Sequence, residues 1–260
     1  AIERLTERNE NLNRAIETLK DDVGASKGSL SVSAYNRAYA YQEEANKNYL
    51  EMARKQAGYH GSHHSFQYYW EGYTEKEIED FSKKIGREWS GKLWDLSPEE
   101  MEQLAAIPEM WEKILDTGKG DYGERVAEKL EDYMDQAGKL EDLTNDFYEG
   151  LTNISFDSLY DGFVDTLMDM ESSAQDFSDD LTEYFTRAMV SNKVGELFSE
   201  KLEDWYGKFG EAMKDNDLSD DERNSLREEY MGYVEEAMKL RDDIASATGY
   251  DSMASGSSQE

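Results

Sequence analysis

The chain has 260 residues, of which 38% are apolar, 12% are aromatic and 33% are charged. Its 59 acidic and 28 basic side chains give a formal net charge of -31, which disfavours direct binding to nucleic acid or to anionic membranes. The aromatic content excludes a wholly disordered chain, and the absence of cysteine excludes disulfides and thiolate metal sites.

The charge is unevenly distributed. Residues 1–57 carry 9 acidic and 9 basic side chains, whereas the remainder carries 50 acidic and 19 basic ones. No apolar run approaches the roughly 20 residues that span a bilayer, and no signal peptide opens the sequence. The chain begins at Ala1 within a repeating pattern and closes on a Ser- and Gly-rich stretch, 251–260, which predicts a flexible tail. We therefore expect a fragment of a longer structural protein.

The first element is a predicted helix with a coiled-coil pattern. Its apolar residues alternate in three- and four-residue steps, with a polar Asn at one a-type position. The segment 24–28 interrupts the pattern, and a second helix is expected over residues 31–57. The simplest interpretation is an antiparallel hairpin over 1–57, and the alternative is self-association of the first helix with other copies. The seam comprises Ile2, Leu5, Asn9, Leu12, Ile16, Leu19 and Val23.

Residues 58–123 are interpreted as a connector rich in aromatic residues and Gly, with short helices. Thr74 and Ser97 precede acidic first turns and predict helix starts. Pro98 follows at a favoured first helical position, and Pro108 is expected to interrupt the helix that begins there. Residues 66–73 are also compatible with a small hairpin of strands.

Residues 124–250 are interpreted as an acidic domain of long helices. One helix is expected over 124–150, another from Ser155, a long one over 174–213, and a last one from Ser219 to about residue 247. The long one alone would span about 60 Å at 1.5 Å per residue, so the sequence predicts an elongated helical bundle.

The three histidines fall within five residues, at His60, His63 and His64. Imidazoles at this spacing bind zinc or nickel in some proteins. The H-E-x-x-H pattern is absent, so an ordinary surface loop is favoured over a metal site. No cofactor is expected.

An aromatic cluster follows the histidines. It fits a contact surface for a partner protein, but such clusters more often close the base of a helical bundle, which is the favoured interpretation. Its members are Phe66, Tyr68, Tyr69, Trp70 and Tyr73.

Other motifs fail on their details. The stretch from Asp215 resembles the start of an EF-hand loop, but Asp220 replaces the required Gly and Leu226 the bidentate Glu. The 118–123 loop lacks the phosphate-loop spacing. Between Glu128 and Glu183 there are 17 acidic and 2 basic residues, which fits a solvated face better than a nucleic-acid mimic. No carboxylate pair stands out as an acid/base couple, and nucleophilic catalysis has no support.

Three stretches resemble phage and prophage tail tape measure proteins. They are Gly58-Tyr59-His60-Gly61-Ser62-His63-His64-Ser65-Phe66, then Leu93-Trp94-Asp95-Leu96-Ser97-Pro98-Glu99-Glu100-Met101, and Ser155-Phe156-Asp157-Ser158-Leu159-Tyr160 leading to Asp176-Phe177. The coiled-coil pattern over 2–12 is also similar, and the resemblance covers most of residues 1–250.

The resemblance implies a long helical protein inside the tail tube whose length sets tail length. Its expected partners are tail tube and tail chaperone proteins, and its location is the virion, with the host cytoplasm during assembly. No peptidase or muramidase motif is present, so no catalytic residue is expected. We predict an all-α structural fragment rather than an enzyme. The alternative is an acidic helical binding module that masks a basic, nucleic-acid-binding partner.

Overall fold

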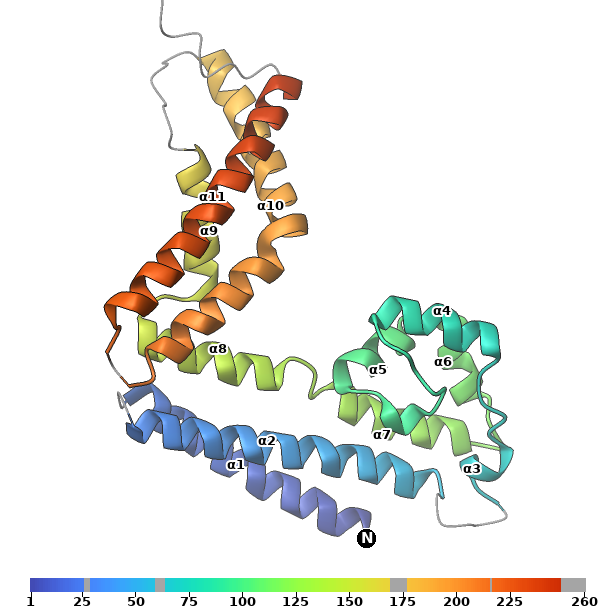
Figure 1. Cartoon of the computed structure of the whole chain (residues 1–260). Coiled ribbons are helices and arrows are strands. Elements are labelled where there is room, and N and C mark those ends of the chain that lie inside the picture. Colours follow the sequence, from blue (N-terminus) through green and yellow to red (C-terminus); the bar gives the residue numbers. More distant parts are fainter. Residues whose placement is uncertain (26–28, 59–63, 169–176, 216, 249–260) are drawn as a thin grey trace, which may run out of the picture. The chain divides into compact units, whose positions relative to one another are not determined.

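The computed structural model describes residues 1–25, 29–58, 64–168, 177–215 and 217–248 (Figure 1). Every regular element in these ranges is a helix, and they contain no strand. The predicted all-α class is therefore confirmed. The chain divides into two compact units, the first comprising Ala1–Ala25 and Ser33–Thr144, and the second Ser26–Val32 and Asn145–Glu260.

The first unit contains an antiparallel helical pair, α1 (Ile2–Ala25) and α2 (Ser29–Gln56) (Figure 1). The Thr6 hydroxyl contacts the Met52 sulfur at 3.5 Å, and Asn9 lies beside Ala45. Small or flexible side chains of α2 are buried, which lets the helices approach closely; they include Ala34, Ala38, Ala45 and Met52.

The remainder of the first unit is a set of short helices around one aromatic and aliphatic core. In chain order they are α3 (Phe66–Tyr69), α4 (Glu75–Ile85), the 3₁₀ turn η1 (Leu93–Asp95), α5 (Pro98–Ala105), α6 (Pro108–Leu115) and α7 (Tyr122–Met134). Ala53 in the last turn of α2 and Ala57 just after the helix also belong to this core.

Local sequence signals set the helix starts in this region. Thr74 and Ser97 each form a capping box, with Glu77 and Glu100 respectively, and Pro98 occupies the first turn of α5. Pro108 opens α6 rather than merely ending α5. The segment 66–73 contains the short helix α3 instead of a hairpin of strands.

Two features differ from the sequence prediction. The helix expected over 124–150 is two helices, α7 and α8 (Lys139–Thr152), separated by a turn over residues 135–138, in which Gly138 has a φ of +76°. A residue with a left-handed backbone cannot continue an α-helix, and Gly adopts that conformation at little cost, so Gly138 redirects the chain just before α8 begins. In addition, the described part of residues 58–123 does not only connect two domains. It packs with α7 in one core. The boundary between the units falls after Thr144, not after 123.

The second unit is built on α9 (Phe156–Met168), α10 (Phe177–Ala212) and α11 (Asp220–Thr248). The pairs Lys201–Glu236 at 2.8 Å and Lys208–Glu229 at 2.6 Å show that α10 and α11 run antiparallel. Helix α9 packs on both (Figure 1). Their shared core includes Phe163, Val164, Leu167, Val190, Val194, Phe198, Leu202, Val234, Ala237 and Ile244.

Candidate functional site

The predicted partner-contact cluster lies mainly in the core of the first unit. Phe66 is only 1% exposed and stacks on Trp70, with ring centroids 5.2 Å apart. Tyr69 stacks on Tyr122 of α7 at 6.4 Å. Tyr68 is the exception, because 61% of its surface is exposed. These aromatic side chains therefore join α3 to the rest of the unit, and only part of the cluster faces solvent.

Tyr73 fixes the segment that follows α3. Its hydroxyl donates a hydrogen bond to the Met110 carbonyl at 3.1 Å, and its ring packs on Trp70 and Trp89. Burial raises the pKa of the Tyr73 hydroxyl well above its usual range, with a further contribution from nearby Glu77. This tyrosine remains neutral at physiological pH and acts as a packed anchor.

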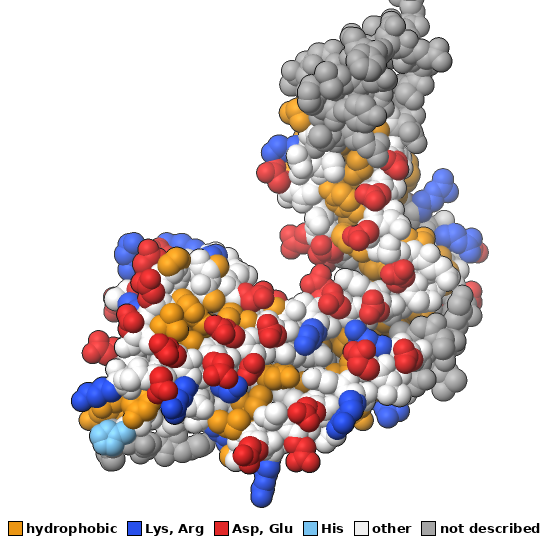
Figure 2. All heavy atoms as spheres, turned by 180° about the vertical axis from the view of Figure 1, so that it is seen from behind, with side chains coloured by type: hydrophobic (Ala, Val, Ile, Leu, Met, Phe, Trp, Pro, Cys, Tyr) orange, Lys and Arg blue, Asp and Glu red, His pale blue; other side chains and the backbone are white. Residues whose placement is uncertain are grey.

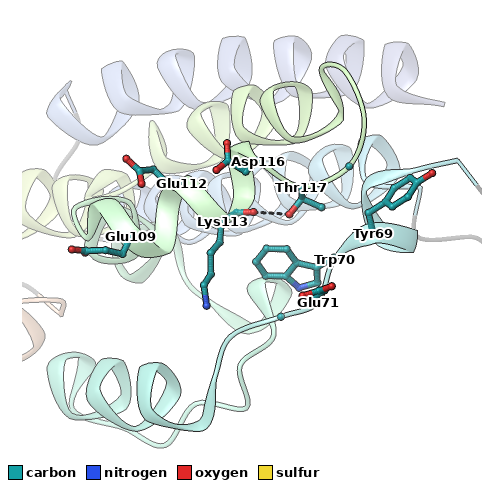
Figure 3. Close-up of a pocket in the computed structure, with 10 residues that line it drawn as sticks. Tyr69, Trp70, Glu71, Glu109, Glu112, Lys113, Asp116 and Thr117 are labelled. Carbon is teal, nitrogen blue, oxygen red and sulfur yellow. Dashed lines mark hydrogen bonds between the residues drawn. The ribbon is translucent and has the colours of Figure 1, made fainter.

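A cavity of about 510 Å³ opens between the segment that follows α3 and helix α6. Figure 3 shows the Trp70 indole and the Lys113 side chain facing one another, with Glu109, Glu112 and Asp116 projecting from α6 and its C-terminal end. The volume falls within the roughly 300–1,000 Å³ range of small-ligand sites. The other lining residues are Tyr69, Glu71, Gly72, Thr117 and Gly118.

The charges around the cavity are unbalanced. Among the described residues that line it, Lys113 is the only basic one, and its Nζ is already bound to Glu77 at 2.6 Å and lies 5.7 Å from the Tyr73 ring centroid. Partial burial works to raise the pKa of Glu77, but hydrogen bonds from Lys113 and Thr74 outweigh it and lower that pKa. Within the described parts of the chain, no hydrogen bond or ion pair engages the carboxylates of the lining acids Glu71, Glu109, Glu112 and Asp116.

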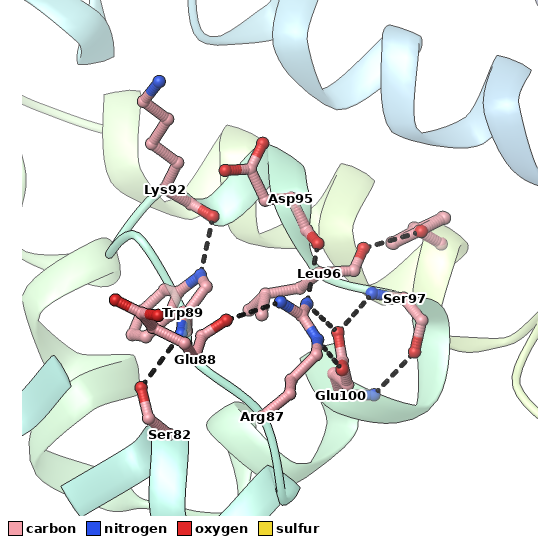
Figure 4. Close-up of polar contacts among 10 residues, drawn as sticks. Ser82, Arg87, Glu88, Trp89, Lys92, Asp95, Leu96, Ser97 and Glu100 are labelled. Carbon is pink, nitrogen blue, oxygen red and sulfur yellow. Dashed lines mark hydrogen bonds and ion pairs between the residues drawn. The ribbon is translucent and has the colours of Figure 1, made fainter. Parts of the chain in front are cut away.

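A second polar cluster stabilises the turn between α4 and α5 (Figure 4). Both Glu100 carboxylate oxygens accept hydrogen bonds from Arg87, each at 2.6 Å. The same guanidinium donates to the carbonyls of Asp95 and Glu88, and Glu100 also accepts from the Ser97 amide. The Arg87 guanidinium and the Glu100 carboxylate are both bonded to groups of the chain itself, so the cluster is structural.

The Arg87 guanidinium holds the pKa of Glu100 below its usual 4.5, against an opposing effect of burial, and the Ser97 amide lowers it further. The carboxylate therefore stabilises the fold above the unfolded pKa, and that stabilisation is lost as pH falls through the lower folded pKa. We expect Glu100→Gln to lose about 1–2 kcal/mol of unfolding free energy at pH 7 and clearly less near pH 3. Urea unfolding at both pH values measures this. Glu102→Gln, an exposed neighbour, is the matched control, and an equal loss at both pH values would contradict the assignment.

The histidine prediction can be placed only in part. His60 and His63 lie outside the described residues, and His64 is exposed. Among the residues that the structure does describe, no group of three or more His, Asp or Glu side chains is arranged to hold a metal ion.

The predicted coiled-coil seam faces α2 of the same chain. Asn9 is 2% exposed; its amide donates to the Ala45 carbonyl at 3.5 Å and its oxygen accepts from Asn48 at 2.9 Å. Ile16 and Leu19 are buried, while Ile2, Leu5 and Leu12 are partly exposed. The side chain of Val23 is not among those that the structure describes. The polar seam position is thus satisfied within one chain.

On the face drawn in Figure 2, the acidic side chains of the described residues do not gather in one patch. Figure 2 shows Asp and Glu side chains distributed over the visible surfaces of both units, with apolar and basic side chains between them. Among the described helices, none is both long and apolar enough to cross a membrane.

Comparison with known proteins gives no family. No protein-family model, no curated protein and no solved structure matches the chain. Any functional conclusion therefore depends on the residues themselves.

The sequence pattern does not single out the acidic residues of α6. A signal is nevertheless present, because Glu109, Glu112, Lys113 and Asp116 are spaced so that they share one helical face. The buried residues Met110 and Ile114 occupy the other face.

Proposed function

We propose that this chain is a structural segment of a phage tail tape measure protein and is not an enzyme. In this proposal it occupies the tail tube lumen of the virion, after assembly in the host cytoplasm with tail tube and tail chaperone proteins. Residues 1–57 are the candidate region for self-association in the full-length parent.

The observation that carries the proposal is the role of the residues that resemble the family. In the stretch 93–101, Leu93, Leu96 and Met101 are almost completely buried, and Ser97 and Glu100 form the capping box of α5. These residues therefore specify one local fold, so a shared motif here is more informative than a shared coiled-coil pattern.

The third similar stretch supports the same proposal. The Ser155 hydroxyl accepts a hydrogen bond from the Ser158 amide at 3.1 Å and so opens α9. Tyr160 then donates to the Ser191 carbonyl at 2.7 Å, which links α9 to α10. Of the end of this motif, Asp176 lies outside the described residues and Phe177 begins α10. The motif thus starts and orients helices of a packed unit.

Deletion of residues 145–248 from the parent gene tests the proposal. If this folded unit contributes to the length-setting path, tails shorten by up to about the length of its longest helix, the 36-residue α10, which is about 54 Å at 1.5 Å per residue. Electron microscopy of released particles measures the tail length, and the intact gene supplied in trans restores it. Tails of unchanged length in the deletion strain would contradict a role in setting length.

A second candidate function is an acidic binding module that masks a basic, nucleic-acid-binding protein. It is favoured by the long acidic helices α10 and α11 and by the acid-rimmed cavity in the first unit. This alternative predicts capture of a basic protein that is lost as salt is raised, without any association with virions. Tail length would then be unaffected by the deletion.

A further inference from the structure

We propose that the cavity between α6 and the segment after α3 binds an arginine side chain presented by a basic segment of a partner protein. This inference concerns the first unit alone and does not depend on the assignment to phage tails.

The first argument is the arrangement of α6. Met110 and Ile114 of this eight-residue helix are buried in the core. The opposite face of the helix therefore borders the cavity. Glu109, Glu112 and Lys113 lie on that face, and Asp116 follows at the end of the helix. Figure 3 shows the three carboxylates pointing outward from the helix and away from Trp70, so they form a rim at the edge of the cavity. A rim of this kind attracts a cation and leaves the cavity itself free for the stem of a side chain.

The second argument is the aromatic wall. Trp70 is held by stacking on Phe66 and by an edge contact with Tyr73, with centroids 5.1 Å apart. A held indole needs little reordering when a ligand packs on it, which lowers the entropic cost of binding. Trp is also the aromatic residue that interacts most strongly with cations.

The third argument is that Lys113, the basic residue that lines the cavity, already has an ion-pair partner. Lys113 is bound to Glu77 from the same capping box that starts α4, so its charge is offset locally. The carboxylates of Glu71, Glu109, Glu112 and Asp116 then leave a clear negative excess around an aromatic surface. The complementary ligand is a cation with an apolar stem.

Arginine fits this combination better than lysine. Its guanidinium is planar, stacks on aromatic rings and binds carboxylates through several donors. The ammonium of lysine is a compact, strongly hydrated charge that gains less from an aromatic wall. Because the cavity is larger than one side chain, the flanking backbone of the basic segment also has room to enter.

A blocked Gly-Arg-Gly-Arg-Gly peptide is the probe, titrated into the intact chain at low ionic strength. Binding is followed by calorimetry and by the NMR signal of the Trp70 indole N–H, which the Trp70→Phe variant assigns. We expect Glu109→Gln combined with Glu112→Gln to weaken binding about tenfold, and the lysine peptide to bind several-fold more weakly than the arginine peptide.

The matched control is Glu102→Gln combined with Glu131→Gln, which removes the same charge from exposed positions on α5 and α7. It should change the affinity by less than about twofold, because solvent and salt screen distant charges. An equal loss in the two double variants would show that only diffuse charge attracts the peptide. That result, an unmoved Trp70 signal, equal affinity for the lysine peptide, or no binding at all would each overturn the proposal.

Discussion

Replacing Trp89 by Ala is expected to lower the unfolding free energy of the first unit by about 3–5 kcal/mol. Trp89 is only 2% exposed, and its ring lies 5.0 Å from Phe81 and 5.5 Å from Tyr73 between ring centroids. Its indole nitrogen also donates to the Lys92 carbonyl at 2.9 Å. Truncation therefore opens a cavity and removes a hydrogen bond that closes the loop between α4 and η1.

Urea unfolding followed by circular dichroism measures this loss. Trp94 supplies the matched control, because it packs against the same core but remains partly exposed. Trp94→Ala should cost clearly less than Trp89→Ala. If both substitutions cost under about 1 kcal/mol, far below the usual cost of a buried Trp, the short helices of residues 66–134 do not form the core described here.

Gly123→Ala is expected to destabilise the first unit by about 3 kcal/mol, the upper range for overpacking. Gly123 lies in the first turn of α7, where an added Cβ would sit 2.1 Å from the Leu115 carbonyl oxygen and 2.3 Å from that of Ile114. Backbone atoms of α6 cannot rotate away as a side chain can. The two helices must therefore separate, or α7 must start later.

Thermal unfolding of Gly123→Ala beside Gly232→Ala gives the decisive comparison. Gly232 lies within α11, where a Cβ added at this residue would have no neighbouring atom within 4 Å. Alanine there should stabilise the helix by about 0.5–1 kcal/mol, because Gly is the poorer helix former. A Gly123→Ala protein as stable as the parent would contradict the close packing of α6 on α7.

Helix starts are the most predictable part of the fold. Thr74, Ser97 and Ser219 carry their capping signals within four residues, and the structure shows the expected contacts with Glu77, Glu100 and Glu222. Such contacts join residues that are close together in the sequence, so they can be predicted directly from it.

The grouping of helices cannot be predicted in the same way. Periodicity carries across Gly138, so the sequence favours a single helix over 124–150, whereas the structure has a turn over 135–138, with a positive φ at Gly138. Likewise, only the packed structure shows that Tyr133 of α7 donates to the Leu96 carbonyl at 2.9 Å and belongs with the aromatic region. Contacts between residues far apart in sequence leave no local signature.

Only part of the candidate site can be predicted from the sequence. The aromatic residues are prominent, and the favoured interpretation of them as core residues agrees with most of their positions. The acidic rim cannot be predicted from the sequence, because carboxylates are abundant throughout the chain. The spacing of Glu109, Glu112 and Asp116 alone therefore does not indicate a site. Their significance depends on Trp70, which lies across the cavity and is separated from them by 39 or more residues.

The most direct test of the tail assignment is peptide mass spectrometry on phage particles purified after induction of the strain that encodes the chain. The proposal predicts peptides from both 1–57 and 124–213, present at a few copies per particle. Tailed particles that lack these peptides would contradict it, and the binding-module alternative would then take its place.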